Sequence, residues 1–229
     1  IITMAELKPQ LADFKWQDPF LLENQLSEDD RMLRDAAAQF AQTELQPLVI
    51  DAYREANVSP ELFPKRGGAG LLGATIPEEY GGFGARYTAY GLIAREIERV
   101  DSGYRSMMSV QSSLVIDPIH AYGSEEQRKK VLPGLCSGAL IGCFGLTESD
   151  AGSDPSGMTT RAVKTATGYR ITGSKMWISN APISDFFVVS AKSEEHCATI
   201  RGFILEKGLT GLTASNIVSS LTCRTRVPA

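Results

Sequence analysis

The chain has 229 residues, of which 43% are hydrophobic and 22% charged, a composition typical of a globular protein with one large domain or two modest ones. Its formal net charge is −4 and it has no cluster of Lys and Arg, which argues against a nucleic-acid partner because phosphate binding depends on concentrated positive charge. No apolar run approaches the roughly 20 residues of a membrane-spanning helix, so no membrane partner is predicted.

The first half of the sequence is predicted to be helical. Ser27 is followed by three acidic residues and has the character of an N-cap. Apolar residues then recur at helical spacing as far as Pro47, which we expect to end or kink the helix. Further helices are predicted over about 92–100, 104–116 (with an end near Pro118) and 124–133.

The pattern changes at about residue 141, where short runs typical of β-strands alternate with turn residues. Strands are predicted at 169–172, 175–179, 186–191 and 202–206. We therefore expect an α+β protein with an α-helical domain over residues 1–139 and a β-domain over 140–229. The tail after about residue 211 is thin in patterned hydrophobic residues and atypical of such a domain.

Common catalytic and metal-binding patterns are missing from the sequence. The four cysteines lack the spacing of metal ligands, so no metal site is predicted. Only two histidines are present, His120 and His196, and no hydrolase motif surrounds either of them, which disfavours a hydrolase triad. No Gly-x-Gly-x-x-Gly follows a predicted strand, so a Rossmann nucleotide-binding fold is not supported.

Two segments of the β-region carry the most chemical information. Residues 144–157, Phe-Gly-Leu-Thr-Glu-Ser-Asp-Ala-Gly-Ser-Asp-Pro-Ser-Gly, are rich in glycine and short hydroxyl side chains, which lets backbone N–H groups approach a ligand closely. Residues 175–180, Lys-Met-Trp-Ile-Ser-Asn, put the indole of Trp177 near the hydroxyl of Ser179. Together they suit a flat, polar-edged heteroaromatic ring joined to phosphates. The alternative is a Gly/Ser loop and a buried tryptophan in a β-domain.

Arg105 stands out in the helical stretch 104–116 because its neighbours are mostly Gly, Ser, Met and Val. An arginine among small residues either pairs with an acid or faces a polar cavity. Asp101, four residues earlier, could form an ion pair with it. The guanidinium could instead hold a ligand carboxylate through two parallel hydrogen bonds.

These motifs resemble those of a known family. Phe-Gly-Leu-Thr-Glu with Gly-Ser-Asp, followed by Met-Trp-Ile-Ser-Asn, is similar to the flavin-binding segments of the acyl-CoA dehydrogenases. Residues 98–114, Glu-Arg-Val-Asp-Ser-Gly-Tyr-Arg-Ser-Met-Met-Ser-Val-Gln-Ser-Ser-Leu, closely resemble one subfamily, the glutaryl-CoA dehydrogenases. The resemblance runs from about residue 14 to 211. It implies an N-terminal all-α domain and part of a middle β-barrel domain, with the family's C-terminal four-helix bundle beyond the end of this chain.

The resemblance also assigns site residues. It implies that Arg105 holds the distal carboxylate of a glutaryl chain, with Ser106 beside it, and that Ser153 lies on the CoA side. The residues implied to bind FAD are Phe144, Leu146, Thr147, Gly152, Ser153, Trp177, Ile178 and Ser179. Glu148, next to the flavin motif, matches a family glutamate with no base role and is interpreted as structural.

The implied function is the FAD-dependent oxidation and decarboxylation of glutaryl-CoA to crotonyl-CoA and CO₂ in lysine and tryptophan degradation. Electrons would pass to an electron-transfer flavoprotein, and the family is homotetrameric. The compartment would be the cytoplasm of a bacterium or the mitochondrial matrix of a eukaryote. Because the family's glutamate base lies beyond the chain end, no catalytic base is assigned, and we expect the chain alone to be inactive. The alternatives are a general short-chain acyl-CoA dehydrogenase and a non-catalytic fragment that binds acyl-CoA or protein.

Overall fold

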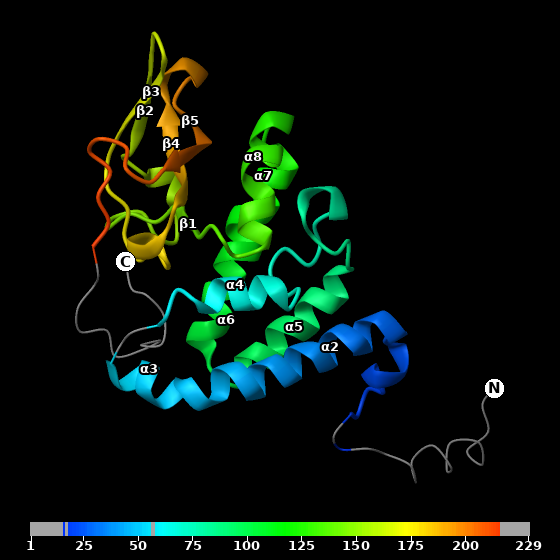
Figure 1. The fold of residues 1–229 in the computed structure, drawn as a ribbon. Helices are drawn as coiled ribbons and strands as arrows, with labels where there is room; N and C mark the ends of the chain where they lie inside the picture. Colours follow the sequence, from blue (N-terminus) through cyan, green and yellow to red (C-terminus); the bar gives the residue numbers. More distant parts are fainter. Residues whose placement is uncertain (1–15, 17, 56–57, 216–229) are drawn as a thin grey trace, which may run out of the picture.

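The computed structural model describes residues 16, 18–55 and 58–215, and it consists of a helical layer followed by a β-sheet (Figure 1). Within the layer α2 packs on α5 and α5 on α6, and the helical segment after α6 packs on strand β1. The sheet therefore stands at one side of the helices, with α2 farthest from it. The predicted tail residues 216–229 lie outside the described part of the chain.

The predicted helices are present, and the structure adds others between them. The bounds of the helices are α2 (Glu28–Phe40), α3 (Val49–Glu55), α4 (Leu62–Gly68), α5 (Tyr87–Glu98), α6 (Ser102–Ser109), α7 (Asp117–Tyr122) and α8 (Glu125–Cys136). Ser27 caps α2 as predicted: its side chain accepts a hydrogen bond from the backbone of Asp30, and the Asp30 carboxylate accepts one from the Ser27 backbone. This reciprocal pair satisfies two N–H groups that the first turn leaves open.

The α-helix that was expected to end or kink at Pro47 already ends at Phe40, and the helix end predicted near Pro118 is not observed. The chain continues past Phe40 in a π-helical turn (Ala41–Leu45) and a 3-10 turn (Gln46–Leu48), which contains Pro47 in its first turn. Likewise a π-helical segment (Val110–Ile116) follows α6 and leads directly into α7, where Pro118 occupies the first turn. Proline is tolerated there because the first-turn N–H groups have no partner within their own helix.

A five-stranded mixed sheet follows the helices. Its strands are β1 (Gly142–Gly145), β2 (Arg161–Thr165), β3 (Gly168–Thr172), β4 (Phe186–Ser193) and β5 (Thr199–Glu206). The central strand β4 pairs antiparallel with β5 on one edge, and parallel with β1 and then β2 on the other. β3 forms an antiparallel hairpin with β2.

The two faces of the sheet pack differently. On β4, Phe186 and Val188 join a buried cluster with the helical residues Val115 and Leu132, whereas Phe187 and Val189 join a second cluster with Cys143 and Ile178. This alternation follows from the two-residue period of a β-strand. One face is thereby fixed against the helices.

The predicted strand at 175–179 is absent, and the segment is irregular. Trp177 has φ 63° and Asn180 has φ 70°, left-handed conformations that interrupt a strand. The alternating hydrophobicity of the segment gave no indication of this, because the conformation depends on contacts with residues far away in the sequence.

Among the described helices, none is both long enough and apolar enough to cross a membrane.

Candidate functional site

The two chemically informative segments lie against each other. The backbone N–H of Met176 donates to the carbonyl oxygen of Thr147 at 2.9 Å. Just after Thr147, Glu148 and Ala151 exchange two backbone hydrogen bonds of 3.2 Å, which close a tight turn around Ser149 and Asp150. The loop after β1 and the irregular segment before β4 therefore form one surface, although nearly thirty residues separate them in the chain.

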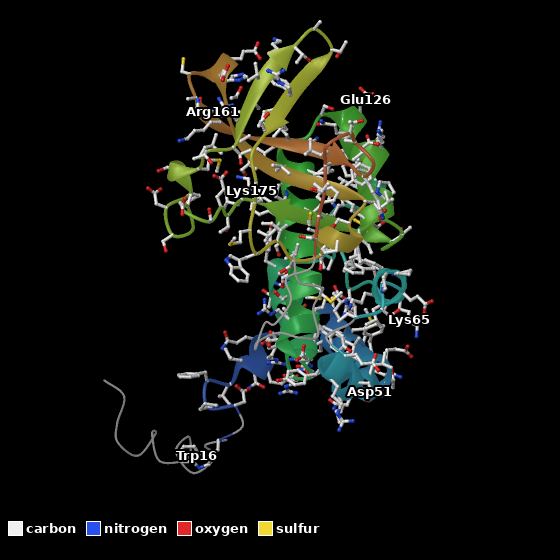
Figure 2. All side chains as sticks on the ribbon, turned by 90° about the vertical axis from the view of Figure 1, so that its left-hand side faces the viewer. Trp16, Asp51, Lys65, Glu126, Arg161 and Lys175 are labelled. Carbon is white, nitrogen blue, oxygen red and sulfur yellow. The ribbon has the colours of Figure 1, made fainter. Side chains whose placement is uncertain are left out.

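A buried ion pair lies beneath this surface. The Nζ atom of Lys175 is 2.8 Å from Oε1 of Glu148, and the two side chains are only 10% and 6% exposed. Lys175 Nζ also donates to the carbonyl oxygen of Leu146 at 2.9 Å. Figure 2 marks Lys175, whose contacts all lead to the loop after β1.

Both oxygens of the Glu148 carboxylate accept hydrogen bonds. Its Oε2 accepts hydrogen bonds from the backbone N–H of Thr159 at 2.6 Å and from the Thr159 hydroxyl at 2.8 Å, and its Oε1 accepts from the N–H and hydroxyl of Thr160. Burial acts to raise the pKa of Glu148, but the hydrogen bonds from Lys175, Thr160 and Thr159 outweigh burial and hold the pKa well below its usual range. Such a carboxylate stays ionised and cannot take up a proton near neutral pH, which agrees with a structural role.

Trp177 is exposed rather than buried. Its side chain is 58% accessible, and its left-handed backbone turns the chain away from the strand direction. The alternative interpretation of a tryptophan buried inside a β-domain is therefore wrong. The next residue, Ile178, is buried and packs in the sheet cluster with Cys143, so the segment is anchored on one side and presents an indole on the other.

The other residues predicted to bind the cofactor fall into two groups. Phe144 packs from β1 toward the helical side, and Leu146, Thr147 and Ser179 are half-buried. Gly152 and Ser153 are exposed in the loop, and a side chain added at Gly152 would meet no atom within 4 Å. The structure brings the segments of Thr147 and Trp177 into contact through the Met176 hydrogen bond, and it leaves Gly152 and Ser153 on the outer part of the loop.

Arg105 lies on α6, and its partner is not the one that spacing suggested. Its Nε donates to Oε2 of Glu98, seven residues earlier, and the two side chains are 36% and 45% exposed. Asp101 instead caps α6 and accepts hydrogen bonds from the N–H groups of Gly103 and Tyr104. Ser106, next along α6, is half-buried.

Two buried amide side chains connect α6 and its continuation to the β-region. Asn180 Nδ2 lies 3.5 Å from the carbonyl oxygen of Met107 and 3.4 Å from that of Gly142. Gln111 donates to the carbonyl oxygens of Leu135 and Leu140 and accepts from the N–H of Gly142 at 2.8 Å. These contacts place the segment that contains Trp177 beside the helix that carries Arg105.

Sequence reasoning did not assign a role to Lys175, Asn180 or Gln111. Lys175 and Asn180 stand at the two ends of the Lys-Met-Trp-Ile-Ser-Asn run, so their position beside Trp177 was the available signal. Gln111, which is fully buried, carried no such signal because its partners come from α8, from the loop after it and from β1.

A cavity of about 690 Å³ opens on the face of the sheet opposite the helices, and Cys143, Ile178, Phe187 and Leu205 are among its lining residues. Arg105, Thr147 and Trp177 do not line it, whereas Lys175 and Ile178 do, so the cavity borders the irregular segment before β4. Within the described ranges no cluster of His, Cys, Asp and Glu is arranged to hold a metal ion.

Comparison with known families gives two adjacent matches. Residues 27–139 match the N-terminal domain of acyl-CoA dehydrogenases, and residues 143–226 match the middle domain of the same family. The first match ends after α8 and the second begins within β1, and together they span most of the chain.

Known structures and sequences agree with this result. A crystal structure of glutaryl-CoA dehydrogenase from Mycobacterium smegmatis superposes with a TM-score of 0.87 and 41% sequence identity, covering 92% of this chain and 54% of that one. A structure of a glutaryl-CoA dehydrogenase from the same organism in complex with FADH2 has a TM-score of 0.87 and 40% identity, covering 91% and 53%.

A mitochondrial isovaleryl-CoA dehydrogenase from Pongo abelii is 36% identical over 207 residues, which are 88% of this chain and 49% of the relative. The chain thus spans about half the length of the relatives it matches. Its two matched domains, their order and the structural agreement lead to one conclusion: the chain belongs to the acyl-CoA dehydrogenase family.

Proposed function

We propose that the surface formed by residues 146–153 and 175–179 binds FAD as part of an acyl-CoA dehydrogenase. The hydrogen bond between Met176 and Thr147 is the observation that carries this proposal. It joins two segments into one surface, and neither segment by itself would suggest a binding site. The related glutaryl-CoA dehydrogenase in complex with FADH2 supports the same cofactor for this chain.

The residues present fit a flavin. The exposed indole of Trp177 offers a flat apolar face, and Thr147 and Ser179 offer short hydroxyl and backbone groups for the polar edge of a ring. The open space around Gly152 lets a ligand approach the backbone closely. When bound, FAD would accept a hydride from the β-carbon of the acyl chain.

Arg105 is the proposed determinant of the substrate. Its Nε donates to Glu98, and its side chain is 36% exposed. The proposed role of its Nη atoms is to hold the distal carboxylate of a glutaryl chain, with the help of Ser106. Ser153 is proposed on the CoA side of the loop. We therefore propose glutaryl-CoA as the substrate, oxidised and decarboxylated to crotonyl-CoA and CO₂.

The catalytic base, the electron acceptor and the oligomeric assembly complete the proposal. No residue of the described chain is assigned as the base that removes the α-proton, and the ion-paired Glu148 is unsuited to this step. An electron-transfer flavoprotein is the proposed electron acceptor, and a homotetramer is the proposed assembly, both from the resemblance to the family.

Binding of two CoA esters to the FAD-loaded protein tests the substrate. Arg105→Ala is expected to weaken glutaryl-CoA binding roughly 10- to 100-fold, because a hydrogen bond to a charged group contributes about 1.5–3 kcal/mol, and to leave butyryl-CoA binding unchanged. Arg95→Ala is the control, since Arg95 pairs with Glu96 on α5 and is half exposed. Calorimetric titration measures both affinities.

The outcome distinguishes the alternatives. An unchanged preference for glutaryl-CoA in Arg105→Ala would favour a dehydrogenase for another short acyl chain, a possibility supported by the similarity to an isovaleryl-CoA dehydrogenase. Binding of CoA esters by a protein that takes up no FAD would favour a non-catalytic acyl-CoA-binding fragment.

A further inference from the structure

We propose that Glu148 and Lys175 are positioning residues of the cofactor site: their buried ion pair fixes the segment around Thr147 against the segment around Trp177, so that the two segments bind one flavin together. This inference rests on the proposed FAD function. It adds that the assembly of the site depends on two residues whose side chains are only 10% and 6% exposed.

The contacts of Lys175 run across the site. Its Nζ reaches the Glu148 carboxylate at 2.8 Å, the Leu146 carbonyl oxygen at 2.9 Å and the Met158 sulfur at 3.8 Å. Leu146 and Glu148 flank Thr147 in the chain. One ammonium group therefore holds the backbone on one side of Thr147 and the side chain on its other side.

Glu148 connects the start of the same loop to its end, next to strand β2. Its carboxylate accepts hydrogen bonds from Thr159 and Thr160, at the point where the loop after β1 returns to strand β2. The loop is thus fixed near both ends, and its middle, which carries Gly152 and Ser153, stays exposed.

Trp177 depends on this arrangement. Only Met176 separates it from Lys175, and the Met176 N–H is bound to Thr147. Its left-handed backbone, with φ 63°, is a conformation that a tryptophan seldom adopts unless the surrounding contacts impose it. We infer that the ion pair on one side and the buried Ile178 on the other hold the indole where the ring of the cofactor needs it.

Loss of one charge would leave the other buried without its partner. The remaining group would turn toward water, and the segment that carries it would move. For this reason a change in one segment is expected to loosen the other, which a purely local contribution to stability would not do.

Hydrogen exchange of the flavin-free chain tests the joining of the two segments. Lys175→Met is expected to speed amide exchange at residues 146–151, and Glu148→Gln at 175–179, as well as in the mutated segment itself. Lys164→Met is the matched control, because Lys164 forms an ion pair with Glu195 in the same β-region but the two side chains are 60% and 34% exposed. The control is expected to leave both segments unchanged.

FAD titration, followed by the visible absorption of the flavin, tests the role in binding. Each variant is expected to bind FAD about tenfold more weakly or worse, by analogy with the effect of residues that orient metal ligands. The double variant is expected to be little worse than either single one, because both remove the same interaction. In the hydrogen-exchange experiment, Lys175→Arg keeps the charge and is expected to retain most of the protection that Lys175→Met loses.

Three results would overturn the inference. Faster exchange confined to the mutated segment would show that the pair does not join the two segments. Unchanged FAD affinity together with a lower melting temperature would show a contribution to stability alone, and additive losses in the double variant would show two independent roles. If the unmodified chain takes up no FAD, the proposed cofactor function fails, while the exchange data still decide whether the pair holds the segments together.

Discussion

The guanidinium of Arg66 lies 5.5 Å from the ring centroid of Tyr104 in the helical core. Arg66 is fully buried, and within the described residues none of its three guanidinium nitrogens has a hydrogen-bond partner. The rings of Tyr104 and Phe63 provide cation–π contacts only. Burial lowers the pKa of Arg66 to about 10, which shows that the charge is destabilising where it lies.

Arg66→Met is therefore expected to stabilise the protein. The drop in pKa from 12.5 to about 10 corresponds to roughly 3 kcal/mol, so a gain of about 1–3 kcal/mol in the free energy of unfolding is expected at pH 7. Urea denaturation measures it, with Lys65→Met on the exposed side of the same helix as the control. A loss of stability in Arg66→Met would contradict this, and would mean that the contacts of Arg66 with Phe63 and Tyr104 outweigh the cost of burying its charge.

Gly67 and Gly68 are adjacent on α4 but are expected to respond differently to alanine. A Cβ atom on Gly67 would lie 2.0 Å from the carbonyl oxygen of Ser137, whereas one on Gly68 would meet no atom within 4 Å. Gly67→Ala must push the end of α8 away and is expected to cost about 1–3 kcal/mol. Gly68→Ala is expected to be neutral or to stabilise by up to about 1 kcal/mol, because it restricts the unfolded chain. Equal effects in thermal unfolding would contradict this close approach of α4 and α8.

Gln111→Leu is expected to destabilise the connection between the helices and the sheet. The substitution removes the hydrogen bonds of Gln111 with the Gly142 N–H and with the carbonyl oxygens of Leu135 and Leu140 in a fully buried position. The Leu135 oxygen still accepts a hydrogen bond from the Gly138 N–H. Each buried polar group left unsatisfied costs about 1–3 kcal/mol, so a total loss of more than about 2 kcal/mol is expected in chemical denaturation. Gln127→Leu, which removes a capping side chain at the exposed start of α8, serves as the comparison and should cost less.

The stability of the protein should depend on the ionisation of Glu148 in acid. Because its pKa is held below the ordinary value of 4.5, the ionised carboxylate stabilises the fold at any pH above about 4.5, and this contribution is lost as the pH falls toward the lower folded-state pKa. The difference in unfolding free energy between the wild type and Glu148→Gln is therefore expected to be largest near neutral pH and to shrink below pH 4.5. A difference that stays constant from pH 7 to pH 3 would mean that the charge of Glu148 is not what stabilises the fold.

The helices were predictable where the signal is local. The Ser27 cap and the apolar spacing after it depend on residues three or four positions apart, and the structure confirms the helix they predict. Pro118 was misjudged because a proline ends a helix or begins the next turn according to what packs around it, and here helical turns continue on both sides of it.

Chain order and residue types alone determined a helical half followed by a β half, the two segments that we propose to bind FAD, and the family resemblance that the comparisons confirm. Only the tertiary structure decided that Trp177 is exposed in an irregular segment, that Arg105 pairs with Glu98, and that Glu148 and Lys175 form a buried ion pair. The reason is physical: propensity and periodicity act over a few residues, whereas burial, ion pairing and a strained backbone are set by neighbours that folding brings from distant parts of the chain.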